Sequence, residues 1–396
     1  MDFFGGNMNK KILVGIAAVL TAIVAFTPLF GGAFSAKADA VQPQGLAKTC
    51  KAAMLLDSET GTVVYEKNTH DHLQIASMVK IMTLGLAFDE IERREIPFDS
   101  VVTASENAAA MGGSQAFLDA NADYKLDELL KSIVVASAND SCVAVAEYLF
   151  GSVDAFVAAM NERAQNLGLT DTKFVNCTGL PQDGQYSCAA DVAAMFKLLT
   201  EHERFFEYAK VWMYDFEHPS GRVTGLTNTN KLIRFYDGCD GGKTGYTDEA
   251  RSCITVTAKR GDTRLICVAI GAENSKTRNK EVSEMLNYGF ANYKTVYAAR
   301  KGDVVGEYAV ANGKTDKITV AVEKDCSAFI ACGERSEFAL EPVINKLTAP
   351  VKSGDVVGKI IIKLNGNDFA EVNAVAQNGC EKKGYKDIIE NFISKW

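Results

Sequence analysis

The pattern of hydrophobic and polar positions predicts strands at both ends of one long segment and helices between them. Two apolar runs, 53–56 and 62–65, flank a glycine-containing turn, which is typical of a β-hairpin. A second pair of apolar runs, 253–257 and 265–269, flanks a polar turn and predicts another hairpin. Strands that are distant in sequence but share one sheet, with helices packed on it, are the simplest arrangement for this order.

The middle of this segment has helical periodicity. Between about 77 and 150, apolar residues recur at helical spacings, for example Met82, Leu86 and Ile91. A further helix is predicted from Phe156 to Leu167, where Gly168 is the candidate C-cap. The last helix of the segment is expected from about Lys280 to Tyr293.

The composition changes after residue 300. Short apolar runs at 318–322, 359–363 and 369–375 are separated by turn residues, and they predict a small all-β domain over residues 303–384. Residues 385–396 place their apolar side chains on one helical face. This short amphipathic helix is either a docking helix or a weak contact with a membrane surface.

The N-terminus has the features of an export signal. Lys10 and Lys11 precede an apolar run from about 12 to 34, and small residues in A-x-A steps end at Ala40. We therefore expect residues 1–40 to be a signal peptide, with a retained anchor helix as the alternative because the run is long. Either interpretation makes the rest of the chain extracytoplasmic.

Composition excludes several classes of protein. The chain has 396 residues, of which 47% are hydrophobic and 23% charged, and its formal net charge is −8. Disorder is therefore not expected, and an acidic chain without a basic cluster argues against nucleic acid as a partner. The ten cysteines have scattered spacings, which leave their pairing open.

The step Ser77-Met78-Val79-Lys80 is the first candidate for chemistry. Residues three apart on a helix share one face, so Lys80 can reach the Ser77 hydroxyl. A serine is a weak nucleophile that needs a base, and a lysine acts as one when burial or a second cation lowers its pKa. Taken alone, this step is more simply explained as a helix cap beside a solvated lysine.

Two more motifs follow along the chain. Lys243-Thr244-Gly245 offers a cation and a hydroxyl to a carboxylate, on a strand that its glycines leave open to a substrate backbone. Ser137-Ala138-Asn139 offers a proton relay and an amide. The same Ser-x-Asn spacing occurs at Ser105-Glu106-Asn107, and each of these two is by itself typical of a helix-capping segment.

The order Ser-x-x-Lys, Ser-x-Asn, Lys-Thr-Gly is that of the penicillin-recognising serine acyltransferases. The chain resembles a low-molecular-mass penicillin-binding protein of the D-alanyl-D-alanine carboxypeptidase type from about 47 to 297. Its β-rich region resembles the small C-terminal domain of the same proteins. The segments that carry the resemblance are QIASMVKIMT (74–83), AMGGSQ (110–115), LLKSIVVASANDSCVAV (129–145), FVNCTGL (174–180), DGGKTGYTD (240–248) and MLNYGFANY (285–293).

The resemblance implies an α+β fold. A β-lactamase/transpeptidase-like catalytic domain, an antiparallel sheet with helices on both faces, would occupy residues 41–298, and the all-β domain would follow. It implies peptidoglycan stem peptides as substrates, β-lactams as inhibitors and no cofactor.

The resemblance also assigns roles to residues. Ser77 is the acylated nucleophile, Lys80 its base and Ser137 the proton relay. Substrate is bound by Asn139, Lys243, Thr244 and Gly245, and Lys243 is expected to lower the pKa of Lys80. The backbone N–H groups of Ser77 and Tyr246 form the oxyanion hole. The chain departs from the family pattern at Tyr246, often histidine, and at Ile75, often proline.

Other functions fit the sequence less well. A class A β-lactamase needs a glutamate in an E-x-x-L-N step, and none occurs between Asn139 and Lys243. A vestigial, cell-wall-binding protein would not need the complete set of catalytic residues. His70-Asp71-His72 has no third metal ligand nearby in sequence, so we expect no metal, and we expect the four histidines to be solvated or in turns.

Overall fold

The structure is a computed structural model that describes residues 45–385 and residue 389. The predicted signal peptide, residues 1–40, and nearly all of the predicted C-terminal helix, residues 385–396, lie outside the described residues.

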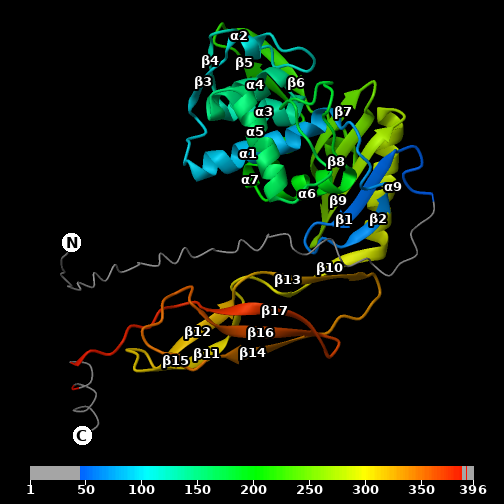
Figure 1. Cartoon of the computed structure of the whole chain (residues 1–396). Coiled ribbons are helices and arrows are strands. Elements are labelled where there is room, and N and C mark those ends of the chain that lie inside the picture. Colours follow the sequence, from blue (N-terminus) through cyan, green and yellow to red (C-terminus); the bar gives the residue numbers. More distant parts are fainter. Residues whose placement is uncertain (1–44, 386–388, 390–396) are drawn as a thin grey trace, which may run out of the picture.

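Within residues 45–385, five antiparallel strands form a central sheet in the order β2-β1-β9-β8-β7 (Figure 1). Both predicted hairpins, β1–β2 and β8–β9, are confirmed. The strand β7 is at one edge of the sheet. The bounds are β1 (Ala52–Asp57), β2 (Val63–Lys67), β7 (Cys239–Thr247), β8 (Arg251–Arg260) and β9 (Thr263–Ala272).

Both faces of this sheet are covered, because successive side chains of a strand point to opposite faces. In β1, Met54 packs in the cluster under the main helical group, whereas Leu55 packs in the cluster under α9. Figure 1 shows α9 on one side of the sheet and α1 and α6 on the other. The helices are α1 (Lys80–Arg93), α2 (Glu106–Ala109), α3 (Leu126–Ala136), α4 (Asn139–Phe150), α5 (Val153–Asn166), α6 (Ala189–Leu199), α7 (Glu203–Ala209), α8 (Leu232–Phe235) and α9 (Ser275–Asn292).

The predicted helical stretch between 77 and 150 is interrupted. It begins with the 3-10 turn η1 (Ala76–Val79) and contains the paired strands β3 (Val101–Thr103) and β4 (Asp123–Lys125). Strands of three residues are too short to produce a recognisable alternation. A further hairpin, β5 (Met213–Glu217) and β6 (Val223–Thr227), follows the helices.

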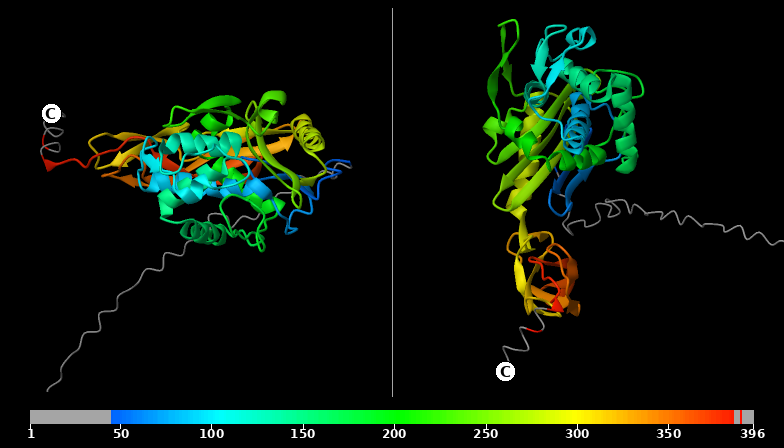
Figure 2. Two further views of the ribbon diagram at one scale, coloured as in Figure 1. Left: turned by 90° about the horizontal axis from the view of Figure 1, so that it is seen from above. Right: turned by 90° about the vertical axis from the view of Figure 1, so that its left-hand side faces the viewer.

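The C-terminal part consists of strands, as predicted, and the right-hand view of Figure 2 shows it as a body below the first. Within residues 45–385, six strands form a sheet in the order β14-β16-β17-β12-β11-β15, and β10 pairs with β13. The two parts meet where Thr295 Oγ1 of β10 donates to Asp57 Oδ1 of β1. The bounds are β10 (Tyr293–Ala299), β11 (Val304–Ala311), β12 (Lys317–Val322), β13 (Cys326–Ala331), β14 (Phe338–Ile344), β15 (Leu347–Thr348), β16 (Val356–Leu364) and β17 (Asn367–Ala376).

All ten cysteines lie within the described residues and are unpaired, and only Cys332 is exposed. Buried thiols of this kind behave as small hydrophobic side chains. In the same part of the chain, no single helix has the length and hydropathy required to cross a membrane, and α4 with α5 meets the requirement only as a pair bent by 84°.

Candidate active site

Ser77 and Lys80 lie together where the helical group meets the sheet. Ser77 is on η1, Lys80 is the first residue of α1, and Lys80 Nζ lies 3.1 Å from Ser77 Oγ. Ala76, directly before the serine, has φ +48°, a conformation that is unfavourable for alanine and must be held by the surrounding packing. The predicted pair is therefore within reach, on a 3-10 turn that leads into the helix.

The Lys80 amine is completely buried. Its Nζ has three oxygen neighbours: Ser77 Oγ, Asn139 Oδ1 at 2.6 Å and Thr178 O at 2.5 Å. Burial lowers the pKa of Lys80. A neutral amine has two hydrogens and one lone pair. When the hydrogens are donated to Asn139 and Thr178, the lone pair faces Ser77, which is the geometry of a general base.

Ser137 contacts the second lysine of the site, Lys243. It ends α3 with φ +62°, and its Oγ accepts a hydrogen bond of 2.8 Å from Lys243 Nζ. Lys243 is in β7 and is 1% exposed. Burial lowers the pKa of Lys243, and the charge of Lys80 lowers it further. We expected this repulsion to act on Lys80, but for Lys80 burial is the dominant cause.

Asn139 begins α4 and uses both ends of its amide. Its Oδ1 accepts from Lys80, and its Nδ2 donates to Gly112 O at 2.7 Å. We predicted that Asn139 binds substrate. In the structure it positions the lysine, while one N–H of its amide group is left for a further acceptor.

Strand β7 lies directly against η1, and Gly245 makes this contact possible. A Cβ atom at residue 245 would lie 2.6 Å from Ile75 O and 3.1 Å from Ser77 N. The first hydrogen bond of η1 is from Met78 N to Ile75 O, so the Ser77 N–H precedes the bonded turn, like other first N–H groups of a helix. The glycine that was predicted to keep β7 open thus brings this strand close to Ser77.

The two residues on either side of Gly245 in β7 differ in exposure. Thr244 is buried, whereas the Tyr246 side chain is 66% exposed. The Tyr246 hydroxyl donates to Asp248 Oδ1, away from the site. This arrangement is compatible with an oxyanion hole that uses only the backbone of residue 246.

Comparison with known proteins identifies the family. Residues 37–274, more than half of the chain, match the family D-alanyl-D-alanine carboxypeptidase, and residues 293–382 match the family "Penicillin-binding protein 5, C-terminal domain". The chain belongs to the D-alanyl-D-alanine carboxypeptidase family.

Relatives cover nearly the whole chain. It is 36% identical to D-alanyl-D-alanine carboxypeptidase DacF of Bacillus subtilis, over 98% of both chains. It is 30% identical to D-alanyl-D-alanine carboxypeptidase DacC of Escherichia coli, over 97% of this chain and 96% of that protein. The crystal structure of penicillin-binding protein 5 from Haemophilus influenzae is 28% identical, with a TM-score of 0.68, over 87% of this chain and all of that chain. These matches confirm the predicted α+β fold of the penicillin-binding proteins.

Two parts of the site were not predicted as functional. The carbonyl of Thr178 accepts from Lys80, and Gly179, with φ +80°, packs so closely that a Cβ atom there would lie 2.1 Å from Ala76 O. These residues belong to FVNCTGL, which contributed to the resemblance but has no catalytic side chain. A backbone acceptor has no residue-type signature, so only the family likeness drew attention to this segment.

Arg278 is the third buried cation of the site. It lies on α9, is 5% exposed and donates to Cys253 O and to Asn279 Oδ1. No carboxylate pairs with its guanidinium among residues 45–385. Burial lowers the pKa of Arg278 to about 10, and its charge contributes to lowering the pKa of Lys243. An arginine alone gives no sequence signal, so it was missed.

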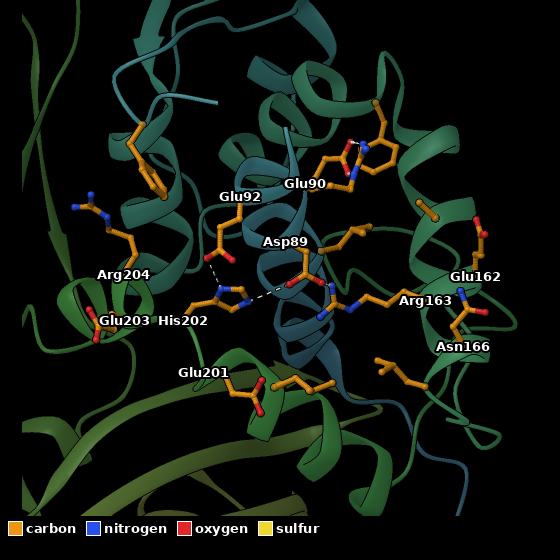
Figure 3. Close-up of a pocket in the computed structure, with 17 residues that line it drawn as sticks. Asp89, Glu90, Glu92, Glu162, Arg163, Asn166, Glu201, His202, Glu203 and Arg204 are labelled. Atoms are coloured by element: carbon orange, nitrogen blue, oxygen red, sulfur yellow. Dashed lines mark hydrogen bonds and ion pairs between the residues drawn. The ribbon is translucent and has the colours of Figure 1, made fainter. Parts of the chain in front are cut away.

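A groove at the other end of α1 is separate from this site (Figure 3). Asp89, in the last turns of α1, pairs there with Arg163 and with His202 Nε2, and His202 Nδ1 contacts Glu92 at 2.9 Å. None of the predicted catalytic residues lines the groove. Carboxylates predominate among the residues labelled in Figure 3, and the basic side chains of Arg163, His202 and Arg204 lie among them.

His218 and His202 are in turns, as the prediction of solvated or turn histidines allows, but both are shielded from solvent. His218 is 4% exposed, and it bonds Tyr124 Oη and Thr224 Oγ1. The His202 side chain is 11% exposed between its two carboxylates. Their buried surroundings come from β4, β6 and α1, which are distant in sequence, so the local sequence did not indicate them.

Proposed function

We propose that Ser77 is the nucleophile with which this chain, a serine-type D-alanyl-D-alanine carboxypeptidase, removes the terminal D-alanine from peptidoglycan pentapeptides. The observation that carries this assignment is the environment of Lys80. Its amine is buried and lies 3.1 Å from the Ser77 hydroxyl, and within the described part of the chain no carboxylate is among its hydrogen-bond partners. A lysine in this environment is suited to accept the serine proton.

Acylation follows from this geometry. Ser77 Oγ attacks the carbonyl carbon of the penultimate D-alanine, and its proton passes to Lys80 Nζ. The carbonyl oxygen becomes an oxyanion, which accepts hydrogen bonds from the N–H groups of Ser77 and Tyr246. The C–N bond then breaks, and the terminal D-alanine leaves after its nitrogen receives a proton through Ser137.

The terminal carboxylate of the substrate is bound on β7. Lys243 supplies a cation, Thr244 a hydroxyl and Gly245 a close approach to the strand. We add Arg278 to this set, because it is a second buried cation that has no acidic partner among residues 45–385. A carboxylate neutralises the field of these groups, which favours peptides with a free C-terminus.

Deacylation completes the reaction. Water attacks the Ser77 ester, its proton goes to Lys80, and the tetrapeptide leaves as Ser77 regains its hydrogen. A β-lactam has a similar amide and carboxylate, so we expect it to acylate Ser77 and to remain bound. A β-lactamase is the second candidate, but the chain lacks the E-x-x-L-N glutamate that activates water in class A enzymes.

The reaction takes place outside the cytoplasm, where peptidoglycan is located. We propose residues 1–40 as the export signal, 41–298 as the catalytic domain and 303–384 as the β-rich C-terminal domain. We further propose that residues 385–396 form a short amphipathic helix that docks or makes a weak contact with the membrane surface.

Release of D-alanine from a synthetic pentapeptide tests the assignment. Wild-type protein and the Ser77→Ala variant are incubated with the peptide, and the products are weighed by mass spectrometry. We expect the tetrapeptide from wild type alone. Full release by the Ser77→Ala variant would contradict the mechanism, and release by neither protein would favour a cell-wall-binding role. Nitrocefin hydrolysis over many turnovers would favour the β-lactamase.

A further inference from the structure

Two histidines that precede the nucleophile turn converge on one carboxylate. His70 Nδ1 lies 2.9 Å from Asp171 Oδ2, and His72 Nε2 lies 3.0 Å from Asp171 Oδ1. The His72 ring is stacked on Tyr186, with centroids 4.3 Å apart. Asp171 is about a hundred residues away in sequence, so the fold supplies a partner that the sequence around His70-Asp71-His72 does not contain.

A thiol completes this group. Cys188 is buried before α6, and its Sγ accepts a hydrogen bond from Asp191 N. The Sγ of Cys188, the ring nitrogen of His70 and a carboxylate oxygen of Asp171 all lie within 4.8 Å of one another. Nitrogen, oxygen and sulfur donors therefore converge on one point at the surface of the catalytic region.

We propose that His70, Asp171 and Cys188 bind a divalent zinc ion, with water in the fourth position. Zinc accepts imidazole nitrogen, carboxylate oxygen and thiolate sulfur in tetrahedral sites. Magnesium and calcium prefer oxygen ligands alone, so this donor set selects against them. His72 contacts the second carboxylate oxygen and orients Asp171, as partners of metal ligands commonly do.

The surroundings of the thiol also favour a cation. The Asp191 carboxylate belongs to the same group of segments, where it accepts hydrogen bonds from Asp171 N and from the Thr172 hydroxyl. Zinc binds a cysteine as the thiolate, so the thiol proton leaves to solvent when the ion binds. The His70 side chain is 74% exposed, which gives an ion direct access from solvent.

The site lies where three segments of the catalytic region are held together. Leu73 and Ser187 exchange two backbone hydrogen bonds, of 2.8 and 3.0 Å. The Thr172 hydroxyl contacts the Ser187 hydroxyl at 2.8 Å. The first segment continues to Ser77, and the segment of Thr172 continues to Thr178, whose carbonyl binds Lys80. A zinc ion bound here would therefore hold together the two segments that continue to Ser77 and to Thr178. Its binding would stabilise the relative positions of Ser77 and Lys80.

Zinc titration of the untagged protein tests this proposal. We expect isothermal titration calorimetry to give one zinc per chain for wild type, and no stoichiometric binding for His70→Ala or Asp171→Asn. His72→Phe retains the stacking on Tyr186 but loses the contact with Asp171, so we expect roughly 10–100-fold weaker binding. Far-UV circular dichroism of each variant checks that it folds.

Two controls make the result specific. His202→Gln alters a histidine that contacts two carboxylates but has no thiol, and we expect wild-type binding. In cobalt-substituted protein, we expect a sulfur-to-cobalt charge-transfer band that is absent from Cys188→Ser. Unchanged titrations of the folded His70→Ala and Asp171→Asn variants, the same band in Cys188→Ser, or no zinc binding by wild type would each overturn the proposal. None of these outcomes depends on D-alanine release, so the test is independent of the proposed catalytic roles.

Discussion

Asn139 Oδ1 lies 2.6 Å from Lys80 Nζ, and this contact ties the start of α4 to the start of α1. Because the Asn139 amide accepts one hydrogen of the neutral amine, the lone pair of Lys80 is directed toward Ser77. The site is therefore assembled around the orientation and the protonation state of one buried amine.

Replacing this amide tests whether it orients the base. Lys80 becomes an ammonium group when it takes the serine proton, and a hydrogen bond to a charged group contributes roughly 1.5–3 kcal/mol. We therefore expect Asn139→Leu to slow acylation by a fluorescent penicillin about 10–100-fold. Asn107→Leu, in the other Ser-x-Asn segment, is the matched control because Asn107 is exposed and bonds Glu147 on the surface. Wild-type acylation by Asn139→Leu would contradict this role.

Removing the base itself has a larger effect. We expect Lys80→Met to lower the acylation rate by about 10²–10⁴-fold, the usual contribution of a general base. Stopped-flow fluorescence with the same penicillin measures the rate, and thermal unfolding checks that the buried methionine is tolerated. A variant that folds and acylates at the wild-type rate would show that another group takes the serine proton.

The pH dependence of acylation reports the Lys80 pKa. Only the neutral amine accepts the serine proton, so the rate rises as the pH rises through the Lys80 pKa, which burial lowers from its usual value of 10.5. Lys243→Gln removes a neighbouring cation that disfavours a second positive charge. We therefore expect the rise of the acylation rate with pH to occur at higher pH in this variant, whatever its maximal rate. A rise that stays in place, or moves to lower pH, would contradict the coupling of the two lysines.

Gly179 and Gly184 have the same backbone conformation, so alanine variants at the two positions separate the effect of backbone strain from that of a steric clash. Gly179 has φ +80° and Gly184 has φ +82°. An alanine at either position loses roughly 1–2 kcal/mol for the left-handed conformation. Only at residue 179 does the new Cβ meet the backbone of Ala76, at 2.1 Å, because at residue 184 the nearest atom is 4.0 Å away.

We therefore expect Gly179→Ala to lose both stability and acylation, and Gly184→Ala to lose stability alone. Chemical denaturation and penicillin labelling of the folded fraction measure the two quantities. Equal labelling of both variants would mean that the segment around Thr178 does not shape the site.

Arg278 is expected to act on the substrate carboxylate. We predict that Arg278→Gln lowers kcat/KM for a pentapeptide about 10–100-fold, which corresponds to the loss of one charge-assisted hydrogen bond. The effect should disappear for a peptide whose C-terminus is an amide. Arg300→Gln is the control, because Arg300 is exposed and pairs with Asp262. A loss that is equal for both peptides would assign Arg278 a structural role.

Local features of the site were predictable from the sequence, and long-range ones were less so. The approach of Lys80 to Ser77 follows from three-residue spacing, and the hairpin β8–β9 follows from two apolar runs around a polar turn. The choice of Ser137 over Ser105 required the order of motifs in the family, because both have the same spacing. Ser105 does cap a helix, α2, as its local sequence indicated.

The remaining features depend on contacts between distant segments. Thr178 contributes a carbonyl oxygen, which every residue has. Arg278 becomes notable only when burial removes it from water and from acidic partners. The Asp171 carboxylate reaches His70 and His72 only after folding, and the same is true of the partners that bury His218. Such features depend on tertiary structure, which local periodicity does not encode.

The most direct test of the central claim is the position of a β-lactam adduct. The purified protein is incubated with benzylpenicillin, digested and mapped by tandem mass spectrometry. We predict one adduct per chain, on the Ser77 hydroxyl, and no adduct in the Ser77→Ala variant. An adduct on another residue, or the absence of any adduct on folded wild-type protein, would contradict the assignment of Ser77 as the nucleophile.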